Sequence, residues 1–283
     1  MKLVRFGEAG KELPGILDRN GIVRSLFGII PDIDGSTISP AGLEKLRTIN
    51  PLDLPKAPDG VRIGPCVSKV SKLIGIGLNY SDHAAESNLP VPTEPIVFLK
   101  ATSAISGPYD QVEIPADAQK TDWEVELGFV IGTRAKNVSI DDALSHVAGY
   151  LIVNDVSERS WQSERQGQWT KGKSHDTFAP IGPWLVTADE IPDPGALTMT
   201  LDVNGIRRQN GSTKTIIFGI AYLVSYLSRF MTLHPGDIVT TGTPPGVGLG
   251  MKPNLYLKPG DVMHLEIAGL GYQKQKVVLE SVV

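Results

Sequence analysis

Three carboxylates stand at strand positions from which they could reach a common point. Residues 121–131 alternate with the period of two that a β-strand has, so Glu124 and Glu126 point to one face. Neighbouring carboxylates on so apolar a strand repel each other and lose hydration unless a cation lies between them. A second apolar run ends at Asn154, and Asp155 adds the third carboxylate there. Because all these donors are oxygens, the set favours Mg²⁺ or Mn²⁺ over zinc.

The same pattern also fits a solvated strand face, so the other polar segments decide between the two interpretations. Residues 77–86 follow an apolar strand, and a helix after Ser81 would place His83 and Glu86 three apart on one face. In that position the carboxylate can orient the imidazole and stabilise its charge when it acts as a general base. Because residues 79–92 have little apolar surface to bury, we expect them to form a mobile lid over the site.

Three further segments carry polar groups at the ends of apolar runs or in loops. The strand at 95–100 ends in Lys100, while Arg159 and Gln162 would share a helical face that suits a substrate carboxylate. Residues 240–248 form a Gly/Pro loop in which the backbone can approach a ligand. Each segment also has an ordinary explanation, namely a strand-end charge, a solvated helix face or a turn.

The elements that must position these residues are mostly short strands. Residues 1–68 have the pattern of a small β-rich domain, with strands at 2–6 and 22–26 joined by a turn at 18–21. A proline-rich passage at 50–60 has the composition of a connector. We therefore expect the N-terminal part to form a domain of its own.

From residue 72 onward, apolar strands alternate with Gly/Pro turns, and helices are few. One helix opens at Ser139, a capping residue followed by acids, and another runs through about 215–231 with apolar residues at helical spacing. A doubly wound sheet needs regular alternation with helices, which this region lacks. The pattern predicts an α+β fold that is mainly β, with the larger domain over residues 69–283.

The composition is that of an ordinary globular protein, with 283 residues, 41% hydrophobic and 20% charged. A net charge of −4 offers no basic surface for nucleic acid or anionic lipid, so neither is expected as a partner. The N-terminus lacks a signal-peptide core, and no run approaches the length of a membrane span. Because Cys66 is the single cysteine, no intrachain disulfide can form, and a reducing, cytoplasmic setting fits best.

A nucleotide hydrolase is the main rival class, because residues 167–174 satisfy the phosphate-loop pattern Gly-x4-Gly-Lys-Ser. Such a loop must follow a buried strand and open a helix. Here a polar, helix-like stretch precedes it, and Pro180 and Pro183 in the stretch that follows oppose a helix. Residues 75–77 are likewise no dinucleotide fingerprint, because Tyr80 stands in place of the third glycine. Nucleotide binding is therefore not expected.

Together, these segments resemble the fumarylacetoacetate hydrolase superfamily from about residue 72 to the C-terminus. The resemblance rests on the order and spacing of six motifs, which are specific together although none is specific alone. They are Asn79-Tyr80-x-x-His83-x-x-Glu86, Phe98-Leu99-Lys100, Glu124-x-Glu126-Leu127, Asn154-Asp155 with Arg159 and Gln162, Lys173-Ser174-x-Asp176-Thr177, and Thr241-Gly242-Thr243-Pro244-x-Gly246-Val247-Gly248.

The resemblance implies a mixed β-roll domain that uses Mg²⁺ or Mn²⁺ to act on 2-oxo or 2,4-dioxo acids, in a homodimer or homotetramer. The metal ligands that it implies are Glu124, Glu126 and Asp155, and the catalytic residues are His83, Glu86 and Lys173. The substrate contacts that it implies are Asn79, Tyr80, Lys100, Arg159, Gln162 and Thr243. One position departs from the pattern, because His175 stands where relatives often have an aromatic residue.

For a 2,4-dioxo acid, the implied reaction is hydrolysis of the bond between carbons 3 and 4, which gives pyruvate and a second acid. His83, oriented by Glu86, would take a proton from the water that attacks carbon 4. Lys173 and the divalent ion would stabilise the negative charge of the pyruvate enolate that leaves. We therefore expect a carbon–carbon hydrolase that acts on ketonic substrates.

Within the superfamily, the N-terminal module and residues 171–178 look most like a branch whose members are often labelled ureidoglycolate lyase. That branch hydrolyses 2,4-diketo-3-deoxy sugar acids, such as those derived from L-rhamnonate or L-fuconate. Stabilisation of an enolate also serves decarboxylation of 2-oxo acids such as oxaloacetate and isomerisation of 2-hydroxy-diene-dioates. Both reactions are therefore alternatives. A catalytically inactive binding protein is a third class, against which the complete set of ligands with His83 and Glu86 argues.

Overall fold

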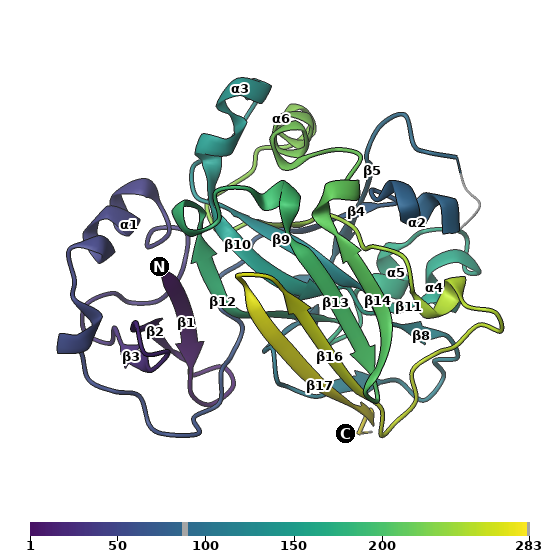
Figure 1. Ribbon diagram of the computed structural model, residues 1–283, viewed down its shortest axis with the longest axis horizontal. Helices are drawn as coiled ribbons and strands as arrows, with labels where there is room; N and C mark the ends of the chain where they lie inside the picture. The colour runs from purple at the N-terminus through teal and green to yellow at the C-terminus, as the bar shows by residue number, and fades with distance from the viewer. Residues whose placement is uncertain (87–89, 282–283) are drawn as a thin grey trace.

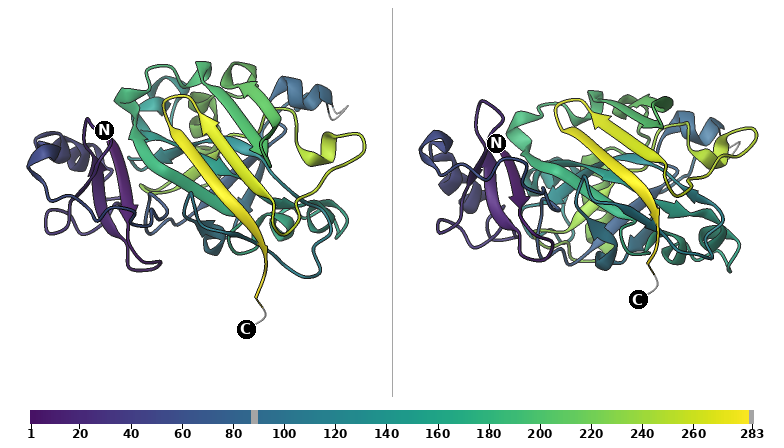
Figure 2. Two further views of the ribbon diagram at one scale, coloured as in Figure 1. Left: turned by 60° about the horizontal axis from the view of Figure 1, so that its bottom comes forward. Right: turned by 90° about the horizontal axis from the view of Figure 1, so that it is seen from below.

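The computed structural model describes residues 1–86 and 90–281 (Figure 1). The N-terminal part, drawn in purple, lies beside a larger body of strands, and two other views show the same arrangement (Figure 2). Within the described residues, no helix combines the length and the apolar character that crossing a membrane requires.

The N-terminal strands form an antiparallel meander of β1 (Lys2–Phe6), β2 (Leu13–Leu17) and β3 (Val23–Ser25). The turn at 18–21 therefore connects β2 to β3, and the direct hairpin expected between the strands at 2–6 and 22–26 is wrong. Pro14 and Gly15 obscure β2 in the sequence, since both residue types are rare in strands. Gly15 suits this position because a Cβ there would lie 3.0 Å from the Phe6 ring.

The main sheet runs through the whole molecule. Its strand order among the described residues is β3-β2-β1-β12-β10-β9-β15-β4-β5, with β6 beside β12. The sheet is mixed, because β15 runs parallel to β4 and β6 parallel to β12 while the other neighbours are antiparallel. Because β1 pairs with β12, residues 1–68 share this sheet with the rest of the chain, and a domain boundary at 68 stays a prediction. The strands beyond the meander are β4 (Leu73–Gly77), β5 (Ile96–Lys100), β6 (Ile105–Ser106), β9 (Val125–Ile131), β10 (Val147–Asn154), β12 (Ala179–Thr187) and β15 (Ile238–Thr240).

A second sheet packs on the main sheet through β9, β10 and β12 (Figures 1 and 2). Its order is β14-β13-β16-β17-β7, and a short pair, β8 with β11, lies apart from both sheets. Two packed sheets of mixed direction with few helices confirm the predicted mainly β, α+β roll with a β-rich N-terminal part. The strands are β7 (Val112–Ile114), β8 (Thr121–Asp122), β11 (Ser157–Glu158), β13 (Thr198–Val203), β14 (Ile206–Ser212), β16 (Val262–Ile267) and β17 (Gly271–Leu279).

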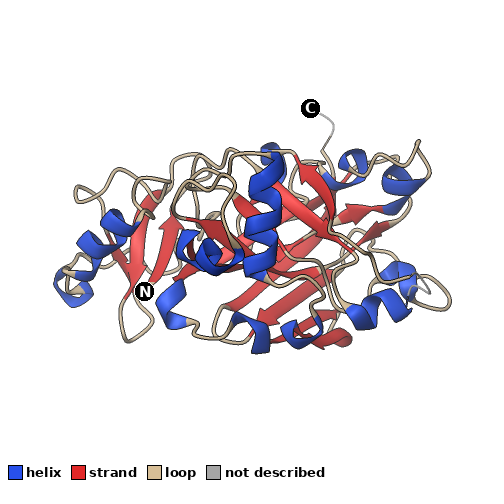
Figure 3. Cartoon of the chain, turned by 90° about the horizontal axis from the view of Figure 1, so that it is seen from above, coloured by secondary structure: helices blue, strands red, loops and turns tan. Residues whose placement is uncertain are grey.

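The helices are short and lie around the sheets (Figure 3). The predicted helix at Ser139 is confirmed as α3, where the Ser139 hydroxyl accepts a hydrogen bond from the Asp142 amide at 3.1 Å. The helix predicted from about residue 215 begins only at Ile220, because a 3₁₀ turn precedes it and Gly219 takes the N-cap position. The α-helices are α1 (Pro40–Arg47), α2 (Ser81–Glu86), α3 (Ile140–Ala143), α4 (Arg159–Ser163), α5 (Thr170–Lys173) and α6 (Ile220–Phe230). The 3₁₀ turns are η1 (Pro51–Asp53), η2 (Thr102–Ala104), η3 (Leu144–His146), η4 (Ala188–Glu190), η5 (Pro194–Ala196), η6 (Thr213–Thr215) and η7 (Gly248–Gly250).

The stretch predicted as one strand at 121–131 is two strands, β8 and β9, separated by Trp123 and Glu124. Every residue of β9 is buried, so both of its faces are covered and the solvated strand face is excluded. β9 pairs with β10 in a register that places Glu126 opposite Val153. This register brings the start of β9 beside the end of β10, where the third carboxylate follows.

Candidate active site

The three predicted metal ligands meet where β10 ends and β9 begins. Glu124, Glu126 and Asp155 offer carboxylate oxygens that all lie within 4.8 Å of one another. The Asp155 amide donates to the Glu124 carbonyl at 2.9 Å, which extends the pairing of the two strands to the ligands themselves. The three residues are 5%, 2% and 0% exposed. Carboxylates so close and so buried require positive charge nearby.

Three basic side chains supply part of that charge. Lys173 Nζ lies 2.7 Å from Glu124 Oε2 and 2.6 Å from Asp155 Oδ2. Arg159 contacts the other oxygen of Glu124 at 2.6 Å. Lys100 contacts the other oxygen of Asp155 at 2.5 Å. Both of these carboxylates are therefore paired on both oxygens.

Glu126 differs, because among the described residues it makes no ion pair with a basic side chain. It accepts hydrogen bonds from the Thr240 hydroxyl and from the Gly242 amide, the latter at 2.8 Å. Burial and the neighbouring charges of Asp155 and Glu124 raise the pKa of Glu126 well above its usual value. The negative charge of the cluster is thus incompletely offset at this carboxylate.

The ion-paired groups Glu124 and Lys173 are stabilised in their charged forms, in contrast to Glu126. Burial alone would raise the pKa of Glu124, but the charges of Arg159 and Lys173 hold that pKa below its usual value. Burial alone would lower the pKa of Lys173, but Asp155 and Glu124 raise it, so this ammonium stays charged. These shifts show strong coupling between a few buried charges in a region of low polarity.

The cluster fits a divalent cation. Its donors are carboxylate oxygens, which hard ions such as Mg²⁺ and Mn²⁺ prefer. A cation between Glu124, Glu126 and Asp155 would offset the repulsion that raises the pKa of Glu126. These three residues can therefore hold a divalent metal ion.

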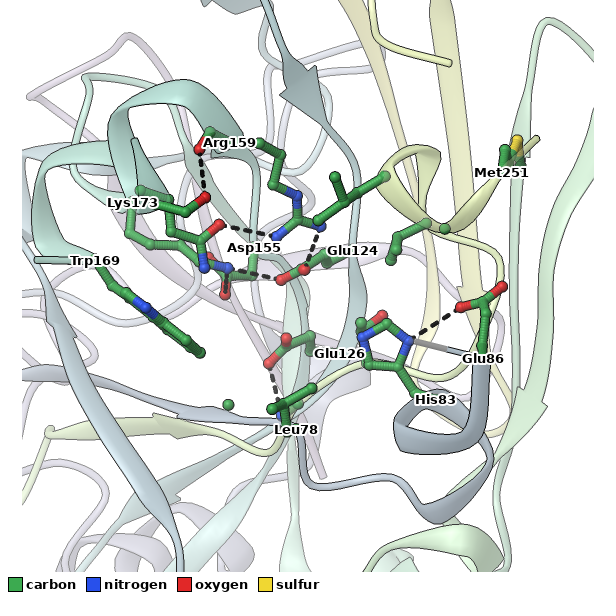
Figure 4. A pocket seen from close by; sticks show the side chains of 18 of the residues that line it. Leu78, His83, Glu86, Glu124, Glu126, Asp155, Arg159, Trp169, Lys173 and Met251 are labelled. Atoms are coloured by element: carbon green, nitrogen blue, oxygen red, sulfur yellow. Dashed lines mark hydrogen bonds and ion pairs between the residues drawn. The ribbon is translucent and has the colours of Figure 1, made fainter. Parts of the chain in front are cut away.

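His83 and Glu86 lie three residues apart on α2, as predicted. His83 Nδ1 is 3.1 Å from Glu86 Oε2, and the Gly246 amide donates to the same carboxylate at 3.0 Å. His83 is only 8% exposed, and its ring lies between Glu86 and the carboxylate cluster (Figure 4). With Nδ1 engaged by the carboxylate, Nε2 is left as the nitrogen that can accept a proton.

The start of the predicted lid is fastened to a neighbouring loop. The Thr215 hydroxyl donates to Asp82 at 3.1 Å, and the Ser81 hydroxyl donates to the Thr215 carbonyl at 3.2 Å. Residues 87–89, in the middle of the predicted lid at 79–92, lie outside the described residues. The mobility of this segment therefore stays a prediction.

One cavity of about 680 Å³ contains both the imidazole and the carboxylates (Figure 4). Arg159 and Gln162 share a face of α4 as predicted, but the guanidinium is already bound by Asp122, Glu124 and Gln162. The predicted site residues that line the cavity are His83, Glu86, Glu124, Glu126, Asp155, Arg159, Gln162, Lys173 and Thr243.

The other three expected substrate contacts, Asn79, Tyr80 and Lys100, do not belong to the described lining of the cavity. Asn79 is fully buried and uses its side chain to hold the backbone of Phe218 and Thr241. Tyr80 is also fully buried, with its hydroxyl 3.3 Å from a methionine sulfur. Lys100 is 3% exposed and contacts Asp155, but it is not itself part of the described lining. These three residues therefore hold other protein groups of the site in place and do not line the cavity.

Asp122 is a part of the site that escaped prediction from sequence. Its carboxylate accepts hydrogen bonds from the amides of Gly248 and Leu249 at 2.7 and 3.0 Å. It also forms an ion pair with Arg159 at 2.9 Å. It therefore links the Gly/Pro loop to the guanidinium beside the carboxylate cluster. An acid within the strand pattern at 121–131 was the only sequence signal for it.

Apolar lining residues also escaped prediction, because nothing in an apolar residue type marks a cavity. Leu78, Trp169, Leu249, Met251 and Pro253 all line it. The alternating glycines at 246, 248 and 250 were the available signal, since bare backbone allows other groups to approach closely.

His175, the departure from the family pattern, does not belong to the described lining of the cavity. Its ring lies edge-on to Phe178 at 5.0 Å and to Trp161 at 6.1 Å between centroids. Its Nε2 has no hydrogen-bond partner among the described residues and lies 3.8 Å from Glu280. His175 therefore fills the space of an aromatic ring.

The stretch that mimics a phosphate loop does not have the required context. Residues 167–174 are preceded by the helix α4, and the strand β12 follows shortly after them. The four-residue helix α5 lies inside the stretch and does not follow it. Lys173 is engaged by two carboxylates, so its ammonium is not free for a phosphate. These contacts agree with the expectation that no nucleotide binds.

Comparison with known proteins gives a consistent result. Residues 72–278 match the family described as fumarylacetoacetate (FAA) hydrolase C-terminal. A protein of Burkholderia ambifaria that is named only as a hydrolase is 59% identical over 276 residues, covering 97% of this chain and 98% of its own.

Similar solved structures carry both hydrolase and isomerase names. The fumarylacetoacetate hydrolase of Exiguobacterium antarcticum matches 99% of this chain and 100% of its own, with a TM-score of 0.86 and 36% identity. The maleylpyruvate hydrolase of Sphingobium sp. SYK-6, solved with manganese(II) and pyruvate, matches the same shares with a TM-score of 0.83 and 29% identity. The 2-hydroxyhepta-2,4-diene-1,7-dioate isomerase of Mycobacterium marinum matches 100% of both chains, with a TM-score of 0.75 and 32% identity.

Proposed function

The chain belongs to the fumarylacetoacetate hydrolase family, and we propose that it is a metal-dependent hydrolase that cleaves the C3–C4 bond of a 2,4-dioxo acid. The products are pyruvate and a second acid. Enzymes of this family include hydrolases and isomerases, so the choice between these two reactions has to come from the site.

The observation that carries the proposal is that a general base, His83, shares one cavity with groups that can stabilise developing negative charge. His83, bound by Glu86 at 3.1 Å, faces the same cavity as the carboxylate cluster and Lys173 (Figure 4). Hydrolysis needs a water molecule activated beside the reacting carbon, together with positive charge where the enolate develops. The presence of His83 and Lys173 in one cavity supports the proposal that this site provides both.

Glu86, His83 and Lys173 have separate roles in the proposed reaction. Glu86 keeps the proton of His83 on Nδ1, so Nε2 takes a proton from the water that attacks carbon 4. When the C3–C4 bond breaks, its electron pair moves onto carbon 3 and is delocalised over the 2-oxo group. Lys173 provides positive charge beside the oxygens that receive this charge. The imidazolium then returns its proton to carbon 3, which completes pyruvate.

We propose Mg²⁺ or Mn²⁺ as the resident ion, held by Glu124, Glu126 and Asp155. When bound, such an ion supplies Lewis-acid stabilisation of negative charge on carbonyl oxygens. The oxygen-only donors support this choice, and so does the manganese(II) in the similar maleylpyruvate hydrolase.

Two narrower questions remain within the proposal. The sugar-acid substrates expected from the sequence, 2,4-diketo-3-deoxy-L-rhamnonate and -L-fuconate, are one candidate class of 2,4-dioxo acid. The similar isomerase structure supports a second candidate function, isomerisation of a 2-hydroxy-diene-dioate, in which His83 would move a proton between carbons without using water.

The test uses the purified full chain, stripped with a chelator and reloaded with Mg²⁺ or Mn²⁺. It is incubated in ¹⁸O-water with acylpyruvates, the 2,4-diketo-3-deoxy sugar acid, oxaloacetate and a 2-hydroxy-diene-dioate. Hydrolysis releases pyruvate and puts the label into the carboxylate of the second acid. Isomerisation changes the ultraviolet spectrum without a change of mass, and decarboxylation releases carbon dioxide. A lack of pyruvate release from every 2,4-dioxo acid would contradict the proposal.

We also propose that the chain forms a homodimer or homotetramer. Among the described residues, β5 is an edge strand of the main sheet, and its Val97 and Leu99 are 36% and 44% exposed. An apolar sheet edge is a surface that proteins usually cover. Light scattering after size exclusion should show an oligomer, and lysine at both positions should release monomers.

A further inference from the structure

The cavity has an apolar wall that the proposed chemistry does not use. Figure 4 shows Trp169 and Met251 on opposite sides of the carboxylate cluster. The two ends of the cavity can therefore be compared by what lines them. The apolar lining residues with the largest side chains are Ile76, Leu78, Phe98, Trp169, Leu249 and Met251.

The end at Trp169 is closed by an aromatic pair that depends on two glycines of β4. The Trp169 and Phe98 rings lie 5.5 Å apart between centroids. A Cβ at Gly77 would lie 2.5 Å from the Trp169 ring, and a Cβ at Gly75 would lie 2.1 Å from the Phe98 ring. Both rings therefore contact the backbone of β4 directly, because neither glycine has a side chain. A substrate chain cannot extend through this end without displacing them.

Among the described residues, the end at Met251 has an exposed rim at 252–254, and the general base directs the substrate toward this open end. A Cβ at Gly250 would lie 2.9 Å from the Glu86 carboxyl carbon, so Glu86 adjoins Leu249 and Met251. The water that His83 activates must reach carbon 4, because that carbon is attacked. The substituent on carbon 4 therefore leaves the polar centre on the side of these two residues.

Apart from Glu86, Lys252 and Asn254, the open end offers mainly apolar surface. Leu249 lines the cavity although it is 47% exposed, and Met251 is half-buried. Beyond the polar centre, Lys252 is the one charged residue in the described lining, and it is exposed. A hydroxyl on the substituent would lose hydrogen bonds to water against this surface, and a second carboxylate would meet no buried cation.

We propose that this enzyme selects 2,4-dioxo acids whose substituent on carbon 4 is an apolar chain, and that Leu249 and Met251 determine this specificity. The inference rests on the proposed function, which places carbon 4 beside His83. Burial of each added methylene then strengthens binding in the transition state until the chain passes the rim at residues 252–254.

The first measurement compares kcat/KM for pyruvate release from acetyl-, butanoyl- and hexanoylpyruvate. We expect a rise of about threefold for each methylene that enters the cavity. The 5-hydroxy analogue of propanoylpyruvate, which has a sugar-acid substituent, should be cleaved on the order of tenfold less well than propanoylpyruvate itself. Equal values along the series, or a preference for the hydroxylated acid, would overturn the proposal.

Variants then assign the effect to residues. Leu249→Ser and Met251→Ser should flatten the dependence on chain length, because each removes apolar contact from the open end. The matched control is Leu144→Ser, at a residue that is 50% exposed and outside the described lining, and it should leave the dependence intact. A preference for fumarylpyruvate that disappears in Lys252→Met would show instead that the site selects dicarboxylates.

A binding measurement separates this inference from the proposed reaction. The 2-oxo acids from pyruvate to 2-oxooctanoate lack the oxo group on carbon 4 and cannot be cleaved, so calorimetry with the metal-loaded protein reports affinity alone. We expect Kd to fall with chain length in the parent and to do so less in Leu249→Ser. If affinity rises with chain length while no dioxo acid releases pyruvate, the proposed reaction is wrong and the selectivity stands. If pyruvate is released without any dependence on chain length, the reaction stands and the selectivity is wrong.

Discussion

The carboxylate of Glu86 is held by the backbone of Gly246. Its two oxygens lie 3.0 and 3.2 Å from the Gly246 amide, while one of them also faces His83 Nδ1 at 3.1 Å. A carboxylate bound on both sides has little freedom to rotate, so the imidazole that it orients is held as well.

The loop that contains Gly246 reaches two other carboxylates. The Gly242 amide donates to Glu126 at 2.8 Å, and the Gly248 amide donates to Asp122 at 2.7 Å. One Gly/Pro loop thus touches a proposed metal ligand, the acid that orients the base, and the acid that holds Arg159. A small displacement of this loop should affect both metal binding and proton transfer.

Gly250→Ala should lower turnover by about tenfold. The new Cβ would lie 2.9 Å from the Glu86 carboxyl carbon and push this carboxylate away from His83. Steady-state kinetics should show the loss in kcat, while calorimetry should show an unchanged Mn²⁺ affinity. Gly219→Ala is the control, because no atom lies within 4 Å of a Cβ there. Equal activity of the two variants would show that the position of Glu86 is not critical.

His83→Ala and Glu86→Ala should each reduce turnover by on the order of a hundredfold or more and spare metal binding. The acid acts only through the base that it orients, so the double variant should be little worse than His83→Ala alone. Near-normal turnover in His83→Ala would remove this residue as the general base. Decarboxylation, which needs neither an activated water nor a proton moved between carbons by His83, would then be favoured.

Metal binding should become tighter as the pH rises. The pKa of Glu126 is raised by burial and by its acidic neighbours, so the metal-free native protein keeps a proton that the unfolded chain has already lost. The stability of the metal-free protein therefore falls as the pH rises from the ordinary value of a glutamate through this raised value. A divalent ion displaces that proton, which makes its affinity depend on pH in the same interval.

Mn²⁺ titrations at several pH values, in buffers with different heats of ionisation, would count the released proton. Glu126→Gln should bind the ion more weakly and lose this contribution to the pH dependence, while the fold survives. Full activity of the chelator-treated parent protein would contradict the metal requirement itself.

Lys173→Ala should lower turnover of a 2,4-dioxo acid and leave nucleotide binding absent. It removes the ammonium that bridges Glu124 and Asp155 at 2.7 and 2.6 Å. Calorimetry of the parent protein with ATP and GTP should show no heat of binding. Micromolar, Mg²⁺-dependent nucleotide binding that disappears in Lys173→Ala would instead support the phosphate-loop interpretation.

The sequence predicts the chemistry of this site better than its supporting contacts. Glu124 and Glu126 are two apart near the start of a strand, and His83 and Glu86 are three apart on a helix. In both cases the geometry of the local element fixes which side chains can meet. Their placement in one cavity therefore follows from local rules together with the order of the family motifs.

Supporting contacts depend on packing between distant segments, which local rules do not contain. Lys100 ends a strand as expected, but its contact with Asp155 depends on packing between segments that are not neighbours, because β9, β15 and β4 separate β5 from β10 in the sheet. Asn79 meets backbone from residues near 218 and 241, so its neighbours come from far along the chain. Trp169 lines the cavity only because Gly77 leaves room for its ring.

The pairing of β1 with β12 also shields a strand edge that would otherwise invite self-association. Leu3 lies opposite Leu185 and Lys2 opposite Val186 in that pairing, and most of β12 is buried. A shortened chain that starts at residue 69 would expose this apolar strand with free backbone hydrogen-bonding groups. The N-terminal segment thus keeps the backbone groups of β12 from pairing with another chain.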